Sequence, residues 1–254
     1  MQYRFRDLQP TLRKVVDDKP TEGFIFGDFD TREVGWWLQS REAPTPTENE
    51  INESVPYMQG HFDFSMYKGE RFFDNREITY KLVIPIGVYS DRKYFEQEIK
   101  RQLMPLGIQN LVDTHEDAYY WQGKCKSVEV DDDSEKGLLT ATVVFDCYPF
   151  AFTNNLEGAD VWDDVIFDHW IWQPVKFNVT KSTDITLENI GSRPVPCGFA
   201  VTGKVTIKGS FFTTMELDAT SGAKADITLP VGKNKINLSG SGTIEFKFRR
   251  EELV

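Results

Sequence analysis

Histidines are the side chains of this sequence that would most directly indicate a metal site or a general base. The three histidines, His61, His115 and His169, lie in separate regions of the chain and form no HxH or HxxxH pair. A zinc site needs several nitrogen or sulfur ligands at one point, and such sites usually show short ligand spacings in the sequence. The histidine pattern therefore gives little support to a zinc site.

Cysteine is the next candidate, as a metal ligand, a nucleophile or half of a disulfide bond. Cys125, Cys147 and Cys197 form neither a CxxC motif nor a regular framework. Folding a predicted hairpin about Ser134–Lys136 brings Cys125 roughly opposite Cys147. In a reducing compartment these thiols are more often small buried hydrophobic groups than a disulfide. The sequence leaves their pairing open.

Two acidic segments could in principle bind a cation. In Asp131–Lys136 the acidic residues alternate as in a calcium loop, but lysine stands at the sixth position, where an EF-hand needs glycine. A hairpin tip is the better interpretation of that segment. The segment Asp163–His169 is the densest polar cluster, and its carboxylates could bind a cation, although a solvated linker explains it as well. We therefore predict no residue of this sequence to be a metal ligand.

Nucleophile and phosphate motifs are missing from the sequence. There is no GxSxG, no SxxK, no GxxxxGK[ST] and no GxGxxG at a strand–helix junction. The glycine-rich stretch Ser239–Gly242 lies between predicted strands, so we interpret it as a turn. Nothing selects a catalytic pair among the 40 acidic residues. The sequence predicts a protein without enzymatic activity and without a cofactor.

Three tryptophans in a short segment permit a different function. Trp162, Trp170 and Trp172 lie near acidic residues, and an exposed aromatic ring beside a carboxylate suits carbohydrate binding. The alternative is that these rings pack in a core or between domains, and we prefer it. A glycan platform is kept as the second hypothesis.

The charge of the chain restricts its partners. The net charge is -11, and it is uneven: residues 1–150 hold 18 Lys and Arg against 27 Asp and Glu, and residues 151–254 hold 11 against 13. Phosphate contacts need basic residues, so an acidic front half argues against nucleic acid as a partner. The first residues lack the apolar region of a signal peptide, and no apolar run is long enough to span a membrane.

Apolar alternation predicts that the first half of the chain is mainly strands. A proline-containing stretch without periodicity, Arg41–Glu50, is predicted to be a solvated loop or arm. At Phe62, Phe64 and Met66 the alternation resumes, which places these three side chains on one face of a strand. Further strands are predicted at 23–26, 35–38 and 76–88.

One helix is predicted, and it should lie on the sheet. Ser90 or Asp91 can cap it, and Phe95, Ile99 and Leu103 share one apolar face. A proline and a glycine shortly after the last of these end it. Charged side chains are expected to cover the remaining surface: Arg92, Lys93, Glu96, Glu98, Lys100 and Arg101.

A long hairpin and a second all-β region follow. Tyr119–Val130 and Leu138–Cys147 flank a segment rich in turn formers. Beyond a connector at 154–174, short strands recur at even spacing, which is typical of an antiparallel sandwich. Its predicted strands are 175–179, 185–187, 197–207, 211–217, 225–229 and 243–248. We place the boundary between a domain of residues 1–152 and a domain of residues 153–254.

The order of several short motifs resembles one known family. Val34–Leu38 is a candidate strand entered by glycine, Val55–Ser65 is similar to a Val-Pro-Gly-x-Asp-Gly-x-x-Asp-x-Ser pattern, and Asn75–Ile78 places an arginine at the start of a strand. In the second half, Leu187–Gly203 and Val231–Ile236 provide glycine and proline turns in a similar order. Together they resemble the distal tail proteins of phages with long non-contractile tails, although Tyr57 and Gln59 depart from the pattern.

The resemblance implies a fold and a role. It implies a tail-tube-like β-sandwich with a helix and a long hairpin, which closes into a hexameric ring, followed by a galectin-like β-sandwich. Such a ring would join the tail tube to the tail-associated lysin or tip protein, carry baseplate or receptor-binding proteins, and belong to the virion after assembly in the host cytoplasm. The stretch Pro44–Asn52 is either a clasp onto a neighbouring copy or a surface loop. The motif residues expected to serve assembly are Gly35, Trp36, Trp37, Pro44, Pro46, Val55, Pro56, Gly60, Asp63 and Arg76.

Overall fold

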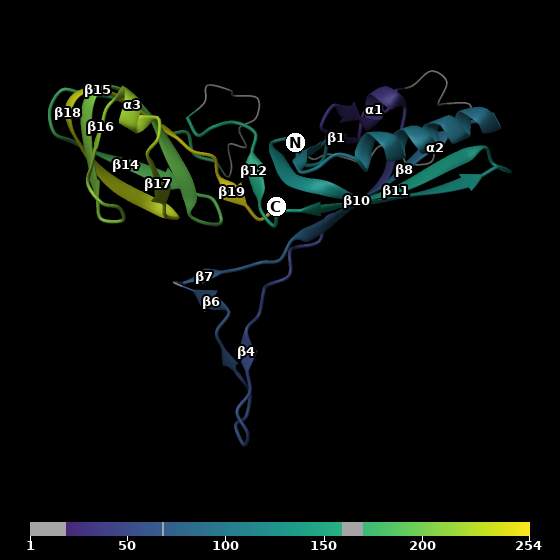
Figure 1. Ribbon diagram of the computed structural model, residues 1–254, viewed down its shortest axis with the longest axis horizontal. Coiled ribbons are helices and arrows are strands. Elements are labelled where there is room, and N and C mark those ends of the chain that lie inside the picture. The colour runs from purple at the N-terminus through teal and green to yellow at the C-terminus, as the bar shows by residue number, and fades with distance from the viewer. Residues whose placement is uncertain (1–18, 68, 159–169) are drawn as a thin grey trace. The chain divides into compact units, whose positions relative to one another are not determined.

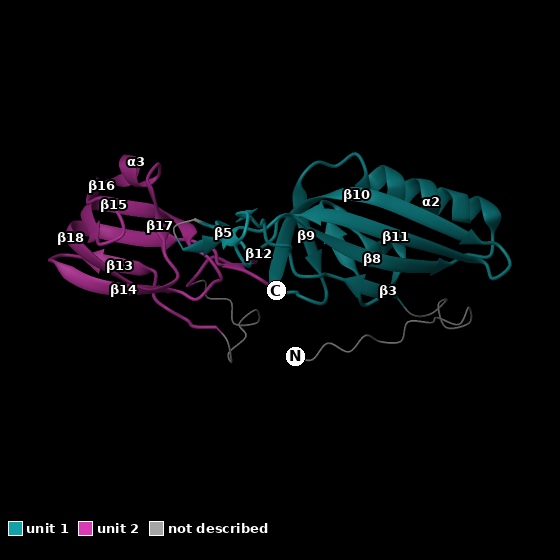
Figure 2. Cartoon of the chain, turned by 90° about the horizontal axis from the view of Figure 1, so that it is seen from below, with its two compact units in different colours: residues 1–151, 254 teal, residues 152–253 magenta. Residues whose placement is uncertain are grey.

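The chain consists of two compact units, which are described separately. The computed structural model describes residues 19–67, 69–158 and 170–254. Unit 1 comprises residues 1–151 together with Val254, and unit 2 comprises residues 152–253 (Figure 2). The prediction of a mainly β chain is confirmed, although the described residues contain three helices rather than one. None of these helices combines the length and apolar character that crossing a membrane would require.

Unit 1 is built on an antiparallel sheet with the strand order β2-β1-β9-β10-β11-β8-β3. Alternation of buried and more exposed side chains along β11, and along β8 as far as Leu82, directs one face of the sheet into the core. Rings of Phe24, Tyr80 and Phe145 contact one another there, with centroids 4.7 to 6.0 Å apart. The strands are β1 (Phe24–Phe26), β2 (Phe29–Asp30), β3 (Trp37–Glu42), β8 (Arg76–Pro85), β9 (Gln109–Asp113), β10 (Tyr119–Asp133) and β11 (Leu138–Cys147).

The predicted helix is α2 (Tyr89–Leu103), which packs against β10 and β11 (Figure 1). Its apolar face is as expected, because Ile99 and Leu103 are buried. Two details of the prediction are wrong. The N-cap is Val88, which provides no side-chain cap, so the cap is neither Ser90 nor Asp91.

The second wrong detail is Arg92, which does not lie on the helix surface. Its side chain is buried and forms an ion pair with Asp132 of β10 over 2.5 Å. It also donates hydrogen bonds to the backbone oxygens of Ile86 and Gly87. The guanidinium can be buried because these acceptors satisfy it, and it thereby joins the helix to the long hairpin.

A short helix that was not predicted from the sequence precedes β3, and the strand predicted at 35–38 begins two residues later than expected. The helix α1 (Thr31–Val34) begins after Asp30, whose carboxylate accepts the backbone N–H of Arg32. Gly35 ends it with a φ of 91°, a left-handed conformation that glycine adopts without strain. The strand therefore starts at Trp37, after the fully buried Trp36, rather than at the glycine.

The long hairpin is present, but its register differs from the predicted one. Cys125 lies opposite Phe145, and Cys147 lies opposite Gly123. The two cysteines are therefore offset by two residues, and both are buried free thiols. Turn residues alone do not fix the register of a hairpin with a loop of several residues.

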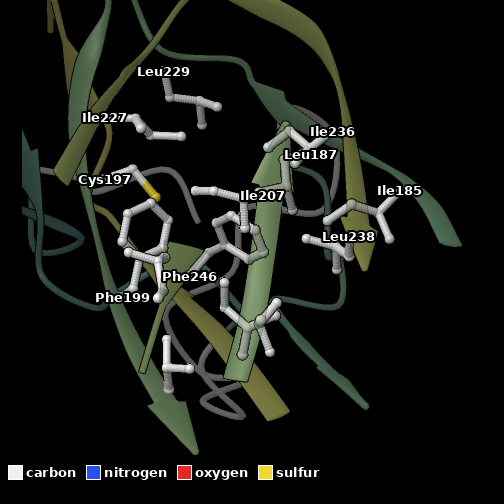
Figure 3. Packing of buried hydrophobic residues seen from close by; sticks show 14 of the residues in the cluster. Ile185, Leu187, Cys197, Phe199, Ile207, Ile227, Leu229, Ile236, Leu238 and Phe246 are labelled. Atoms are coloured by element: carbon white, nitrogen blue, oxygen red, sulfur yellow. The ribbon is translucent and has the colours of Figure 1, made fainter. Parts of the chain in front are cut away.

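Unit 2 contains a six-stranded antiparallel sheet in which β15 and β18 pair along most of their length. Buried side chains of several strands converge on one core, among them Leu187, Phe199, Ile207, Leu238 and Phe246 (Figure 3). The elements are β13 (Lys176–Val179), β14 (Thr183–Asn189), β15 (Val195–Gly209), β16 (Met215–Leu217), α3 (Ala219–Gly222), β17 (Asp226–Leu229) and β18 (Gly232–Lys247). Two short strands, β12 (Ala151–Thr153) and β19 (Glu251–Glu252), pair with each other.

The stretch Ser239–Gly242 is part of β18 and not the predicted turn. A Cβ atom added at Gly242 would lie 1.9 Å from the backbone oxygen of Thr202 on β15. Glycine is therefore needed where the two strands approach each other closely, and not to reverse the chain. This explains why β18 extends from Gly232 to Lys247 while the prediction began it at Thr243.

Candidate assembly arm and its buried base

Residues 43–75, which connect β3 to β8, form an extended excursion that we call the arm (Figure 1). It contains two short antiparallel pairs, β4 (Asn52–Glu53) with β5 (Phe62–Asp63), and β6 (Met66–Tyr67) with β7 (Glu70–Arg71). Backbone hydrogen bonds join its two sides elsewhere, for example from the N–H of Asp74 to the oxygen of Thr47 over 2.9 Å. The predicted solvated loop is thus one side of a paired arm.

Local sequence explains how the arm is shaped. Pro44 and Pro46 lack a backbone N–H, so pairing begins only after them. The carboxylate of Asp63 accepts the backbone N–H of Ser65 over 2.8 Å, and the Ser65 hydroxyl accepts the N–H of Ile51 over 2.8 Å. Hydrogen bonds from the side chain and backbone of Ser65 lower the pKa of Asp63. This Asp-x-Ser unit therefore fixes the two sides of the arm against each other.

The apolar side chains of the arm are exposed. Phe62 begins β5, Met66 begins β6 and Phe64 lies between the two short strands; all three side chains are more than half exposed. Monomeric proteins rarely expose so many large apolar side chains in one place unless the surface binds a partner. The exposed apolar residues of the arm are Ile51, Val55, Tyr57, Phe62, Phe64, Met66 and Phe72.

The arm is also acidic. Residues 43–75 contain six Asp and Glu, at 48, 50, 53, 63, 70 and 74, against Lys68 and Arg71, which gives 2 − 6 = −4. The positive charge of Arg71 is neutralised within the arm, because Arg71 forms an ion pair with Glu48 on the other side of the arm. A surface that is both apolar and negatively charged selects a partner with apolar and basic groups.

Arg76 joins the two ends of the arm at the sheet. Its side chain is 2% exposed, and its guanidinium donates to the backbone oxygen of Ala43 over 2.8 Å and to that of Val254 over 2.6 Å. Burial, and beside it the charge of Arg41, lowers the pKa of Arg76. Arg76, one of the motif residues predicted to serve assembly, thus lies at the base of the arm.

A second buried polar cluster lies beside this base and was missed by the sequence analysis. Asp113 is 2% exposed; it accepts a hydrogen bond from Arg41 Nε over 2.7 Å and one from the Tyr80 hydroxyl over 2.5 Å. The Arg41 guanidinium lies 5.3 Å from the centre of the Trp121 ring. Burial, followed by the charge of Asp113, raises the pKa of Tyr80 well above its usual value. Arg41 and Asp113 are 72 positions apart, so no spacing rule links them.

The cysteines do not have the properties of nucleophiles. Burial raises the pKa of Cys125 to about 11 and those of Cys147 and Cys197 to about 12. A reactive cysteine needs the opposite shift, because the thiolate is the attacking form. Over the part of the chain that the structure describes, no group of three or more His, Cys, Asp or Glu could hold a metal ion. The cluster Asp163–His169 lies outside the described residues.

Seven of the ten predicted assembly residues lie along the arm or at its base. Gly35, Trp36 and Trp37 lie at the end of α1 and the start of β3, away from the arm in sequence and within the sheet layer. Their role in assembly stays a prediction, as does that of the others. The residues that share the arm or its base are Pro44, Pro46, Val55, Pro56, Gly60, Asp63 and Arg76.

The tryptophans of the glycan hypothesis have different environments. Trp162 lies outside the described residues. In unit 2, the Trp170 ring lies 4.4 Å from the guanidinium carbon of Arg250, which forms an ion pair with Glu157 over 3.0 Å. Trp172 is 58% exposed. One of the two described rings therefore packs against a buried ion pair, while the other is open to solvent.

Comparison with solved structures identifies the fold. The Dit protein (gp 19.1) of phage SPP1, described as a paradigm of hub adsorption apparatus in Gram-positive infecting phages, matches with a TM-score of 0.63 and 12% identity over 92% of this chain and 100% of that chain. A chain of the phage P2 baseplate, in its activated conformation with Ca, matches with a TM-score of 0.42 and 10% identity over 87% and 92%. No protein-family model and no curated protein matches the sequence. The resemblance to distal tail proteins is confirmed at the level of the fold.

Proposed function

We propose that this protein is a structural hub of a phage tail tip or baseplate. The observation that carries the proposal is the fold shared with the SPP1 Dit protein over 92% of the chain, which includes both units. In this role, residues 1–152 close into a hexameric ring, and residues 153–254 form the galectin-like domain. The ring joins the tail tube to the tail-associated lysin or tip protein and carries baseplate or receptor-binding proteins. The protein assembles in the host cytoplasm and remains in the virion.

The arm supports an assembly function independently of the fold comparison. It combines seven exposed large apolar side chains with a net charge of −4, and Arg76 fixes both of its ends to the sheet. Ordering such an arm in the free protein reduces the entropy lost when it binds a neighbour. We propose that it is the clasp between copies, and that the role of the protein is not enzymatic.

Imaging and mass measurement of assemblies test the ring. The full-length protein alone and mixed with its phage's tail tube protein is studied by native mass spectrometry and negative-stain electron microscopy. We expect six-fold rings that stack on the tube. The double variant Phe62→Ser/Phe64→Ser should lose rings while keeping its unfolding midpoint, because both side chains are exposed. A strictly monomeric protein under all these conditions contradicts the proposal.

A second candidate function rests on Trp172. An exposed tryptophan on a β domain can stack on a sugar ring, and contact with the host cell wall would suit a tail tip. Binding to cell walls is measured by pull-down for the native protein and for Trp172→Ala, with the exposed Tyr94→Ala as the matched control. Loss of binding in the tryptophan variant alone supports this function, and no binding by the native protein eliminates it.

A further inference from the structure

The strand pair β4–β5 of the arm has an apolar face. Glu53 lies opposite Phe62 in this pair, and the backbone N–H of Phe64 donates to the oxygen of Ile51 over 2.8 Å, which continues the pairing by one step. Because side chains alternate across a strand, Ile51, Phe62 and Phe64 share one face with Glu53. The three apolar side chains are more than half exposed, and the two phenyl rings lie 6.2 Å apart. This face is therefore an open apolar surface beside one carboxylate.

The opposite face of the pair is polar and negatively charged. Asn52 lies opposite Asp63, and its amide donates to the carboxylate of Glu50 over 3.0 Å. All three of these side chains are exposed. From Phe62 to Phe64 the exposed side chains are thus apolar, acidic and apolar in turn, and they point alternately to the two faces.

Each strand of this pair has an outer edge that another strand can join. Among the described residues, β4 and β5 form a two-stranded sheet and pair only with each other. The backbone groups of such an edge can pair with an extended segment of another chain, and the alternating side chains then decide which segment fits. A segment that joins β5 should be apolar, basic and apolar in turn, because apolar side chains then meet on one face and opposite charges on the other.

The chain itself contains this pattern at Tyr3–Phe5. Residues 1–14 hold four basic residues against one acidic residue, which gives 4 − 1 = +3, although the net charge of the whole chain is −11. They precede the described part of the chain, which begins at Lys19. A similar order at Phe246–Phe248 is unsuitable, because both of those phenyl rings are buried in the core of unit 2. Residues 1–14 therefore complement the arm, whose net charge is −4, in both charge and side-chain order.

We propose that Tyr3–Phe5 of one copy joins the outer edge of β5 in a second copy, with Arg4 opposite Asp63. This inference rests on the proposed hub function and names the contact through which the arm connects two copies. In either strand direction the two middle residues face each other, and the two aromatic rings of the segment lie beside the two of the arm. Cross-strand aromatic pairs and pairs of opposite charge both stabilise a sheet.

The strand order of unit 1 favours a second copy over the same chain as the source of the segment. The arm connects β3 to β8 at one end of that order, whereas the chain before β1 leads to a strand next to β2, at the other end. Three strands, β9, β10 and β11, lie between β1 and β8. Complementary surfaces at different edges of one molecule give a head-to-tail contact, and such contacts form rings when the rotation closes.

Charge reversal tests the contact in the full-length protein. Arg4→Glu places a like charge opposite Asp63, so we expect self-association to weaken by about tenfold or more. The double variant Arg4→Glu/Asp63→Lys restores opposite charges and should assemble again. Asp63→Asn should also weaken assembly; it removes the charge and keeps the oxygen that accepts the N–H of Ser65, so the arm stays ordered. Sedimentation velocity and native mass spectrometry measure the assemblies.

A matched control separates this contact from a general effect of charge. Arg101→Glu reverses an exposed arginine on α2 and should assemble like the native protein. The unfolding midpoint of each variant shows that it is folded.

A disulfide trap identifies which copy provides the segment. Arg4→Cys mixed with Asp63→Cys should give a linked dimer under mild oxidation, because opposed residues of neighbouring strands bring their Cα atoms to about 4.5–5.5 Å. Peptide mapping identifies the link between positions 4 and 63. Tyr94→Cys, which replaces an exposed tyrosine on α2, should not link to Arg4→Cys. In the double variant Arg4→Cys/Asp63→Cys the link should join two chains, and a link within one chain would contradict the proposal.

Failure of the contact and failure of the hub function give different results. If native rings form but Arg4→Glu assembles like the native protein, or the charge-swapped double variant does not recover, the contact is wrong while the hub function stands. If the native protein never assembles, alone or with the tail tube protein, the hub function fails and the contact fails with it.

Discussion

The guanidinium of Arg76 donates a hydrogen bond to the backbone oxygen of Ala43 over 2.8 Å, although the two residues are 33 positions apart. Ala43 begins the arm, and Arg76 follows its last residue. One buried side chain thus connects the two points at which the arm joins the sheet. The orientation of any surface that the arm presents depends on this contact.

Replacement of Arg76 by methionine should therefore loosen the arm and destabilise unit 1. The oxygens of Ala43 and Val254 lose their donor in a partly buried place, which costs about 1–3 kcal/mol of the free energy of unfolding. Urea unfolding measures the loss, and limited proteolysis should show earlier cleavage within 43–75. The matched control is Arg71→Met, whose ion pair with Glu48 is exposed and should therefore contribute little to the free energy of unfolding. Equal losses for both variants would contradict the assigned role.

The pair of Arg41 and Asp113 should show strong coupling in a double-mutant cycle. Asp113→Asn leaves a partly buried guanidinium without its carboxylate, so we expect a loss of about 3 kcal/mol in the free energy of unfolding. The double variant Arg41→Met/Asp113→Asn should lose clearly less than the sum of the two single variants, because no buried charge is left unpaired. Thermal and urea unfolding give the four values. Additive losses would mean that the ion pair contributes little.

Gly242→Ala should destabilise unit 2 severely, whereas Gly198→Ala should be tolerated. A Cβ at Gly242 would lie 1.9 Å from the oxygen of Thr202, and one at Gly198 has no atom within 4 Å. We expect a loss above about 3 kcal/mol for the first variant, because β15 and β18 must separate, and a change within about 1 kcal/mol for the second. Differential scanning calorimetry of the full chain measures both. Normal stability of Gly242→Ala would disprove the close approach.

The three thiols should be unreactive in the native protein. With pKa values of about 11 for Cys125 and about 12 for Cys147 and Cys197, the thiolate fraction at pH 8 is about one in a thousand or less. Iodoacetamide at pH 8 should label none of them within the time that labels all three in urea. Mass spectrometry counts the adducts. Rapid labelling of a native thiol would show that its environment is open.

Regular elements with long-range burial were predictable from the sequence. The alternation of Ile78, Tyr80 and Leu82 identified β8, and the apolar face of Ile99 and Leu103 identified α2, because a strand or helix that buries one face must repeat apolar residues with its own period. The long hairpin and most strands of unit 2 were predicted for the same reason. For these long elements, the type of element follows from the local periodicity of the sequence.

Partners across long sequence distances were not predictable. Arg92 was placed on the helix surface because a charged residue is usually solvated, yet Asp132 and two backbone oxygens bury it. The pairing of Arg41 with Asp113 and the contact of Gly242 with β15 likewise depend on chain segments brought together by folding.

The arm shows most clearly which features follow from the local sequence and which depend on the folded structure. The sequence by itself determined that residues near Phe62 and Phe64 alternate, that prolines keep 44–46 out of a regular strand, and that the region is acidic. Only the tertiary structure decided that these rings are exposed rather than buried, and that Arg76 holds both ends of the arm. The periodicity of apolar residues in the sequence indicates which side chains share one face of a strand or helix. Whether that face meets the protein's own core or a partner depends on what the rest of the chain places against it, and this is settled only by the folded structure.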